Sequence, residues 1–334
     1  MNELISYFGP KHIPEDIRDR YNVAYLQPGD TDSLEKFEGR SVSVLETPSV
    51  ALPDALLLRI AGLLLYPGRH PQNHHDLEVL SNEGIRTAYF ENDTPWNRAV
   101  VNYLLKAVGS FLARDLQTFA NIETRKEIKL RENNSDLKIG VIGTGSIGGR
   151  FARNSRRMFP NANISYSNER GKKPGLEELG ILRKNWFRIF EDSDVVVASL
   201  PHFPETEHRI GEEELGRMGK DSLFVSVSGG GVVNEGDLVG VLQENPGLTA
   251  IIDTALDETN NWINTPYIKY LKRGFSNLIL TYHSAYKDSE STKRLVYAIT
   301  RPLLHPNMSN LPTNLSVRVP GECYNDDGYN LRID

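Results

Sequence analysis

A glycine-rich segment near the middle of the chain constrains its fold more than any other feature. Gly143, Gly145 and Gly148 have the spacing G-x-G-x-x-G, directly after the apolar run 138–142 and before a helical pattern that ends near residue 159. In this strand–turn–helix context, glycines permit a tight turn, close approach of a pyrophosphate and packing of the helix on the strand. The segment therefore predicts a dinucleotide-binding unit. The alternative is that the glycines only turn the chain.

Short apolar runs alternate with helical patterns on both sides of this segment. The expected strands are residues 4–8, 23–26, 42–45, 63–66 and 85–89, followed by 138–142, 163–166, 195–200, 223–226, 249–253 and 278–282. Such alternation is typical of parallel sheets that are covered by helices on both faces. The predicted fold class is therefore α/β, with two Rossmann-like or flavodoxin-like domains built on doubly wound parallel sheets.

The segments between these elements indicate how the domains divide. A long helix is expected to begin at residues 93–95, to run toward residue 128 and to bridge two domains before the polar, turn-rich linker 131–136. After the last expected helix, 291–304, the tail is rich in Asn, Pro and Gly and is expected to be irregular. We expect a smaller substrate domain of residues 1–112 and 285–334, into which a cofactor-binding domain of residues 113–284 is inserted.

Charge and composition argue against several other classes of protein. The 38 Lys and Arg residues against 44 Asp and Glu give a net charge of −6, which argues against a nucleic-acid partner. Cys323 is the single cysteine, so no intrachain disulfide or multi-cysteine metal cage can form. Residues 1–10 do not resemble a secretory signal, and the apolar stretch 55–66 is shorter than the roughly 20 residues of a membrane span. We expect a cytoplasmic protein without a membrane partner.

The identity of the cofactor depends on the end of the second strand of the cofactor domain. An NAD site usually carries an acidic residue there, about 20 residues beyond the glycines, which binds the ribose hydroxyls. Ser167 falls at that position and is followed by Asn168 and Arg170, and a small hydroxyl beside a cation suits the 2′-phosphate of NADP. We predict NADP as the cofactor. NAD is the alternative if Glu169 binds the ribose, and Arg170 could also belong to a solvated loop without a ligand.

Several stretches from the glycine turn to His283 agree in order and spacing with one enzyme family. These are SDVVVASLPHFPETEH at 193–208, GGGVV at 229–233, IIDTALDE at 251–258 and NLILTYH at 277–283. Together they resemble the NAD(P)-dependent D-2-hydroxyacid dehydrogenases over roughly half of the chain. The resemblance implies a dehydrogenase or reductase that acts on CH–OH or C=N groups of a small molecule and forms a homodimer.

The resemblance assigns His283 as the catalytic acid/base, Glu258 as its partner and Asp253 as the residue that holds the nicotinamide. Hydride transfer to a carbonyl leaves an alkoxide that needs a proton, which an imidazole can donate, and a nearby carboxylate favours the charged ring. The alternatives are a structural histidine at a strand end and an exposed turn at Glu258. The expected cofactor-binding residues are Gly143, Gly145, Ser146, Ile147, Gly148, Ser167, Asn168, Arg170, Leu200, Pro201, Asp253 and His283.

The resemblance fails at the group that binds the substrate carboxylate. Gly229 stands where the family has a catalytic Arg, and Pro71 has no N–H in a loop whose backbone N–H groups bind the same carboxylate in the family. Because a bidentate cation is lost, either another cation replaces it or the substrate is not a simple 2-oxo acid. The candidate substrate residues are Arg69, His70, Trp96, Arg98 and Gly229. Pro71 also prevents one helix from presenting His70 and His74 together, so no metal site is expected.

The sequence therefore predicts an NADP-preferring oxidoreductase that transfers hydride between nicotinamide C4 and a carbonyl or C=N carbon, with His283 as the acid/base. Two alternatives stay open. One is a true 2-hydroxyacid or 2-oxoacid reductase in which Arg69 or Arg98 restores the lost charge. The other is a dinucleotide-binding sensor without turnover, although His283 beside Glu258 favours an enzyme because a sensor needs no tuned acid.

Overall fold

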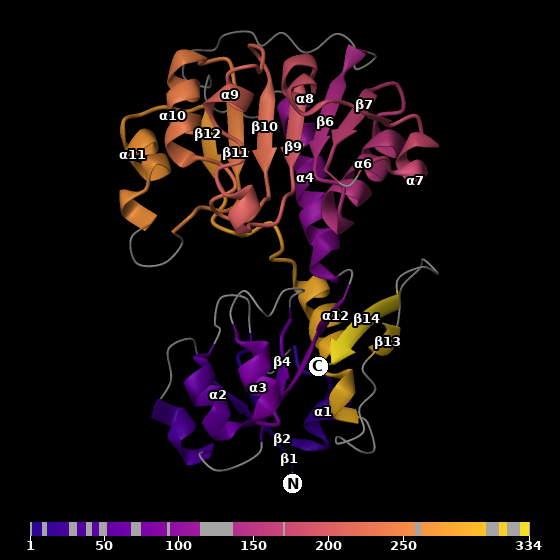
Figure 1. The fold of residues 1–334 in the computed structure, drawn as a ribbon, viewed down its shortest axis with the longest axis vertical. Coiled ribbons are helices and arrows are strands. Elements are labelled where there is room, and N and C mark those ends of the chain that lie inside the picture. The colour runs from indigo at the N-terminus through magenta and orange to yellow at the C-terminus, as the bar shows by residue number, and fades with distance from the viewer. Residues whose placement is uncertain are drawn as a thin grey trace. The chain divides into compact units, whose positions relative to one another are not determined.

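The chain folds into two compact units, which differ in size and sheet topology. A computed structural model describes residues 2–8, 12–26, 32–37, 42–46, 52–67, 75–91, 94–113, 136–169, 171–257, 262–304, 314–318 and 328–333. The first unit comprises Met1–Trp96 and Lys287–Asp334, and the second comprises Asn97–Tyr286 (Figure 1). The second unit is thus inserted in the sequence of the first. The boundaries expected from the sequence, 112/113 and 284/285, remain a prediction of where the functional domains divide.

The first unit is built on a sheet with the strand order β13-β14-β5-β4-β3-β1-β2. Its strands are β1 (Asn2–Ser6), β2 (Tyr21–Tyr25), β3 (Val42–Leu45), β4 (Ala61–Leu65), β5 (Arg86–Phe90), β13 (Asn314–Arg318) and β14 (Gly328–Ile333), and its helices are α1 (Glu15–Arg18), η1 (Asp32–Phe37), α2 (Asp54–Ile60), α3 (Leu77–Asn82), α12 (Ser289–Ile299) and η6 (Arg301–Leu304). Strands β1 to β5 pair in parallel, as the alternation of elements predicts. Ile5, Val44 and Leu64 lie in one buried core with Leu57 and Leu80 of the helices.

The prediction of an irregular tail is wrong for two segments. Strands β13 and β14 pair with each other in an antiparallel manner, and β14 also joins β5, where Leu331 lies opposite Phe90. Leu331 and Ile333 are buried and the residue between them is exposed, so this part of the tail carries the period-two pattern of a strand. The Asn, Pro and Gly content of the tail obscured that pattern in the sequence.

The second unit holds a fully parallel sheet with the order β12-β11-β10-β9-β6-β7-β8. Its strands are β6 (Lys138–Ile142), β7 (Asn163–Ser167), β8 (Leu182–Arg183), β9 (Val195–Ala198), β10 (Leu223–Ser226), β11 (Thr249–Ile252) and β12 (Leu278–Leu280). Its helices are α4 (Trp96–Leu112), α6 (Ser146–Met158), α7 (Pro174–Glu177), α8 (Trp186–Asp192), η4 (Pro204–Thr206), α9 (Glu212–Leu215), α10 (Glu235–Glu244), η5 (Trp262–Asn264) and α11 (Pro266–Lys272). The strand order reverses between β6 and β9. In such sheets, ligands bind beyond the carboxyl ends of the strands at this point.

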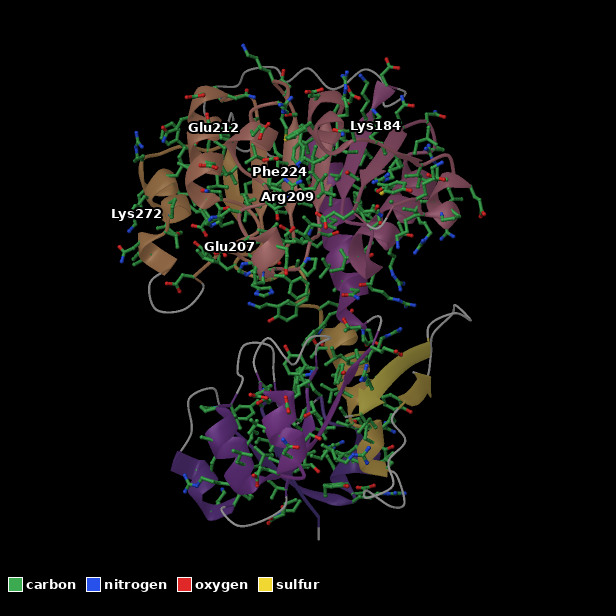
Figure 2. The ribbon with its side chains drawn as sticks, in the orientation of Figure 1. Lys184, Glu207, Arg209, Glu212, Phe224 and Lys272 are labelled. Carbon is green, nitrogen blue, oxygen red and sulfur yellow. The ribbon has the colours of Figure 1, made fainter. Side chains whose placement is uncertain are left out.

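Successive residues of the central strands enter two separate cores. In β9, Val195 and Val197 pack in one core with α4 and α6, whereas Val196 and Ala198 pack in the other with α10. Because both faces of the sheet are covered, these strands are continuous apolar runs in the sequence. Phe224 of β10 lies in the interior of this unit, while Lys272 is exposed at the end of α11 (Figure 2).

The long helix expected from the sequence corresponds to α4, which ends at Leu112; its expected extension to residue 128 lies outside the described residues. No helix in the described part of the chain is long and apolar enough to cross a membrane.

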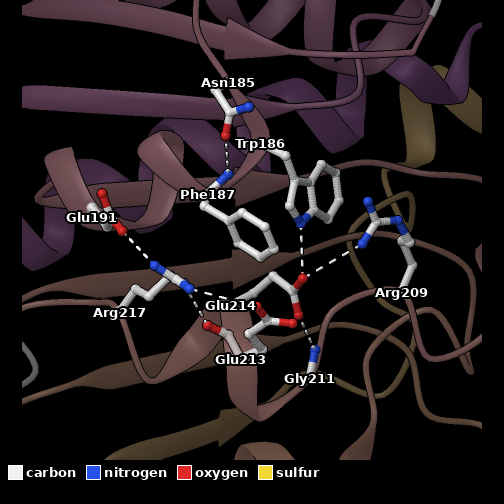
Figure 3. Close-up of polar contacts among 9 residues, drawn as sticks. All are labelled: Asn185, Trp186, Phe187, Glu191, Arg209, Gly211, Glu213, Glu214 and Arg217. Carbon is white, nitrogen blue, oxygen red and sulfur yellow. Dashed lines mark hydrogen bonds and ion pairs between the residues drawn. The ribbon is translucent and has the colours of Figure 1, made fainter.

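A buried carboxylate ties α8 to the segment that leads into α9 (Figure 3). Glu214 accepts hydrogen bonds from the indole N–H of Trp186 at 2.9 Å and from the backbone N–H of Gly211 at 3.1 Å. The guanidinium of Arg209 lies 3.5 Å from the same carboxylate and stacks 4.0 Å above the Trp186 ring. Ile210, between Arg209 and Gly211, forms an isolated parallel β-bridge with Val233, which follows the glycines at 229–231. The cluster therefore fixes one side of that glycine segment.

In the first unit, a buried glutamate–histidine pair joins the loop after β3 to the start of α3. Glu46 Oε2 lies 2.9 Å from His75 Nε2, and both side chains are completely buried. Glu46 Oε1 accepts a hydrogen bond from the backbone N–H of Leu52 at 2.8 Å. The rings of His75 and Tyr66 are nearly perpendicular, with the centroids 6.1 Å apart. Both carboxylate oxygens of Glu46 thus bind buried groups.

Replacing Glu46 with Ala is expected to destabilise the protein by about 2–4 kcal/mol, because two buried partners lose their acceptor. Urea unfolding followed by circular dichroism measures the change. Glu78→Ala, at an exposed position on α3, removes the same charge and is expected to cost less than about 0.5 kcal/mol. Equal losses in the two variants would contradict the structural role of the pair.

Candidate active site

The glycine segment connects β6 to α6, as the sequence predicts. Gly143 follows β6 with φ of +81°, a conformation that favours glycine, and its N–H donates to the carbonyl of Ser167 at 3.0 Å. Gly145 is the N-cap residue of α6 and is exposed. Ser146 and Ile147 begin the helix and are partly exposed. Helix N-termini bind anions, so this turn is suited to phosphate groups.

The glycines of this turn have different surroundings. A Cβ on Gly148 would lie 2.0 Å from the carbonyl oxygen of Gly143 and 2.5 Å from Ser199 Oγ, so only glycine lets the helix pack on the turn. A Cβ on Gly145 would meet no described atom within 4 Å. The backbone at Gly145 is therefore open to a ligand. The residues present fit a dinucleotide pyrophosphate at this helix end.

The end of β7 carries polar groups beside the glycine turn. Ser167 is the last residue of the strand and is buried, and the Asn168 Nδ2 atom makes a short hydrogen bond to Thr144 Oγ1 in the turn. The Oδ1 atom of Asn168 is buried without a partner among the described residues. Arg183 of β8 donates to the carbonyl of Asn168 at 3.1 Å, which places a cation at this strand end. Sequence reasoning missed Arg183 because the two-residue strand that carries it has no recognisable pattern.

The loops after β9 and β10 are joined by hydrogen bonds. Leu200 N–H donates to Ser228 Oγ at 2.9 Å, and Gly229 N–H donates to the Leu200 carbonyl at 3.0 Å. Ser199 Oγ also reaches the Gly143 carbonyl at 3.2 Å. These bonds connect the Ser199–Leu200 segment with the glycine turn on one side and with Gly229 on the other, and Pro201 follows at an exposed position.

The carboxylate of Asp253 builds the turn that presents His283. Its Oδ1 atom accepts from Thr281 Oγ1 at 2.6 Å, Ser284 N at 2.9 Å and Ala285 N at 3.1 Å, and its backbone carbonyl accepts from His283 N. Asp253 itself is only 4% exposed. These hydrogen bonds turn the chain after Leu280, where β12 ends. The prediction of a strand through residue 282 is therefore wrong.

The turn holds His283 just beyond the carboxyl end of β12. Tyr282 and His283 have φ of 49° and 52°, a left-handed conformation that is costly for residues other than glycine. The hydrogen bonds to Asp253 compensate for this cost. The His283 side chain is exposed and its ring meets Tyr286 edge to face, with the centroids 5.4 Å apart. Because the strands are parallel, this turn and the glycine turn lie at the same edge of the sheet.

Tyr103 on α4 extends the hydrogen bonds of this turn. Its hydroxyl lies 3.0 Å from Thr281 Oγ1, which itself donates to Asp253. Burial raises the pKa of Tyr103 to about 12, with a smaller contribution from the negative charge of Asp253. Tyr103 therefore stays protonated and supports the turn. Its position in an amphipathic helical pattern gave no sign of this role.

Glu235 positions the loop that leads to Glu258. It is buried at the start of α10 and accepts from Leu256 N at 2.9 Å, and burial raises the pKa of this carboxyl group. Glu258 itself lies outside the described residues, as do Arg69, His70 and Arg170. Their expected roles stay predictions.

Trp96 and Arg98 are near each other in sequence but belong to different units. The indole N–H of Trp96 donates to Thr292 Oγ1 at 3.2 Å, and its ring lies 6.4 Å from that of Phe8. Arg98 is partly buried on α4. Within the described residues, no group of three metal-ligating side chains is arranged to hold an ion.

A glycine turn open at a helix N-terminus, at the switch point of a parallel sheet, defines a dinucleotide-binding protein of the Rossmann type. A family model described as "D-isomer specific 2-hydroxyacid dehydrogenase, NAD binding domain" matches residues 104–285, more than half of the chain. The chain belongs to this family, which confirms the resemblance found in the sequence.

Related proteins agree with this assignment. Glyoxylate reductase from Aeropyrum pernix is 30% identical over 189 residues, which cover 55% of this chain and 54% of the relative. The chain thus spans about half the length of the curated relatives it matches. D-lactate dehydrogenase from Aquifex aeolicus, solved with NAD and lactic acid, has a TM-score of 0.71 at 20% identity, covering 89% of this chain and 92% of that one. An acyclic imino acid reductase solved with NADPH and D-arginine has a TM-score of 0.66 at 18% identity, covering 88% and 94%. These structures confirm the fold class.

The two glycines at the start of α6 give a matched test. Gly148→Ala is expected to lower the melting temperature by several degrees, because its Cβ would overlap the Gly143 carbonyl. Gly145→Ala is expected to leave the melting temperature unchanged and to weaken dinucleotide binding, because its methyl group would enter the open space. Differential scanning fluorimetry and cofactor fluorescence titration measure the two effects. Unaltered cofactor binding in Gly145→Ala would contradict the assigned phosphate site.

Proposed function

We propose that this protein is an NADP-preferring oxidoreductase of the D-2-hydroxyacid dehydrogenase type. It would transfer hydride between nicotinamide C4 and a carbonyl or C=N carbon of a small molecule. The observation that supports this most is the turn held by Asp253, which leaves His283 exposed at the sheet edge that also carries the glycine turn. A binding protein without turnover would not need a titratable side chain on a strained turn there.

The proposed cofactor-binding residues lie at or near the carboxyl ends of the strands of the second unit. Gly143, Gly145 and Gly148, with Ser146 and Ile147, would hold the pyrophosphate at the N-terminus of α6. Ser167, Asn168 and Arg170 would bind the adenosine ribose and its 2′-phosphate, and Leu200 and Pro201 would line the path to the nicotinamide. The guanidinium of Arg183 places a positive charge beside Asn168, which supports NADP as the preferred cofactor. The same fold accommodates NADPH in the acyclic imino acid reductase.

When bound, the nicotinamide supplies or accepts the hydride. His283 would donate a proton to the carbonyl oxygen during reduction and accept it during oxidation. Glu258 would favour the charged imidazole, while Glu235 holds the loop before it. Asp253 would orient the nicotinamide amide through Oδ2, which accepts no hydrogen bond from a described residue. The proton would thus come from a group whose backbone is fixed before substrate binds.

The substrate is proposed to differ from a simple 2-oxo acid, because Gly229 offers no guanidinium to a carboxylate. The candidates for the other substrate contacts stay Arg69, His70, Trp96 and Arg98. A homodimer and a cytoplasmic location stay predictions from the sequence.

His283→Gln is expected to lower kcat at least about 100-fold, because the proton donor is removed while a polar side chain of similar size is kept. The measurement is NADPH oxidation with 2-oxo acids, ketones, aldehydes and cyclic imines as substrates. Tyr282→Phe, at the neighbouring exposed position, is the control and should retain activity. A His283→Gln variant with unchanged kcat would exclude His283 as the donor.

Ser167→Asp is expected to reduce kcat/KM for NADPH at least about tenfold and to spare NADH, because a carboxylate at this strand end repels a 2′-phosphate. Ser167→Asn, which adds similar volume without charge, separates repulsion from crowding. If the unmodified protein instead prefers NADH by about tenfold, the NADP assignment is wrong.

A further inference from the structure

His202 occupies the space that a side chain at Gly229 would need. A Cβ built on Gly229 would lie 2.6 Å from the Cβ of His202 and 2.9 Å from its backbone nitrogen. The imidazole continues across the next residues, since a Cβ on Gly231 would lie 2.9 Å from both Cε1 and Nε2 of the ring. His202 therefore lies along the segment 229–231. A histidine from the neighbouring loop thus fills the space beside Gly229, the position where the resemblance places the family's arginine.

The two backbones that create this arrangement are held on both sides. Gly229 N–H donates to the carbonyl of Leu200, two residues before His202, and His208 N–H donates to the carbonyl of Gly231 at 2.7 Å. Gly231 has φ of +92°, which favours glycine, and a Cβ on Gly230 would lie 2.0 Å from the carbonyl oxygen of Ala255. Each of the three glycines is thus required by a close neighbour or by its conformation. These bonds hold the backbone on both sides of His202 next to the segment 229–231.

The His202 ring can bind a ligand. The residue is partly exposed, it lies beyond the carboxyl end of β9, and its ring makes no hydrogen bond to any described residue. Leu256, whose Cδ1 atom is also 2.9 Å from the Cβ position of Gly231, places the ring beside the loop that leads to Glu258. An imidazole at this place lies at the end of the sheet where ligands of such folds bind.

We propose that His202 determines substrate specificity by donating one hydrogen bond to an oxygen beside the reacting carbon. This inference rests on the proposed function. A guanidinium presents two parallel N–H groups that match a carboxylate, whereas each edge of an imidazole offers a single N–H. One donor suits one acceptor oxygen. The substrate class that fits is a carbonyl compound with a neutral acceptor next to the reacting carbon, such as a 2-oxo amide, a 2-oxo ester or a 1,2-dicarbonyl compound.

Steady-state kinetics with NADPH and three small substrates test this assignment. Pyruvamide carries a neutral acceptor beside the ketone, pyruvate carries a carboxylate, and propanal carries neither. The unmodified protein should have a higher kcat/KM for pyruvamide than for pyruvate. His202→Ala should lower kcat/KM for pyruvamide about tenfold, the value of one hydrogen bond, and leave propanal unchanged. His202→Gln, which keeps an N–H donor, should recover part of the loss.

His208→Ala is the matched control, because this exposed histidine lies on the same loop and its hydrogen bond to Gly231 uses the backbone N–H, which alanine keeps. Equal losses on all three substrates in His202→Ala would show a structural role only and would overturn the inference. A loss confined to pyruvate would overturn the neutral-acceptor class. If the unmodified protein binds NADPH but reduces no substrate of any class, the proposed function itself fails, and the inference fails with it.

A second measurement tests the packing without any turnover. Gly229→Ala should lower the melting temperature because the new methyl group meets the Cβ of His202. Adding His202→Gly removes this nearest contact and leaves the backbone nitrogen of His202 at 2.9 Å, so the double variant should be more stable than the sum of the single effects predicts. Additive effects would overturn the claim that His202 fills the space at Gly229.

Discussion

The carboxylate of Asp253 is the group on which the geometry of the candidate site depends. One oxygen accepts a hydroxyl and two backbone N–H groups from residues 281–285, and these bonds hold Tyr282 and His283 in a left-handed conformation. Without a buried acceptor, such a turn would relax, since each left-handed residue costs of order 1–3 kcal/mol. The cost is compensated within the fold, and the result is a histidine whose backbone is fixed while its side chain remains exposed.

The parallel sheet brings residues that are far apart in sequence to this turn. The carboxyl ends of β6, β9, β10 and β11 place Gly143, Ser199, Ser228 and Asp253 along one edge, and hydrogen bonds between adjacent loops then fix their order. Tyr103 adds a bond from α4, a helix that packs under the same sheet. The site is therefore a property of the strand order, and each loop contributes one or two groups to it.

Local patterns predicted the parts of this arrangement that depend on neighbouring residues. The strand, glycine turn and helix over 138–158 follow from apolar runs and from the steric needs of Gly143 and Gly148. Long-range contacts decided the rest. The end of β12 depends on Asp253, which is about 30 residues away in sequence, and β14 pairs with β13 and with β5, a strand far away in sequence. Arg183 is positioned by the pairing of β8 with β7, and Tyr103 by the packing of α4 on the sheet. Neither contact can be predicted from the periodicity of the sequence.

Glycine has opposite meanings at two positions of the site. At Gly145 an added Cβ would enter open space, so the absent side chain leaves room for a ligand. At Gly229 it would meet the Cβ of His202, so the room is already filled by the protein. The sequence alone treats both as missing side chains, and the loss of arginine at Gly229 then suggests a lost function. In the structure, a side chain at Gly229 and the side chain of His202 exclude each other, because both would need the same space. Under the role proposed for His202, an imidazole that can bind one oxygen stands in place of a guanidinium that binds two, and the kind of substrate that the site selects changes with it.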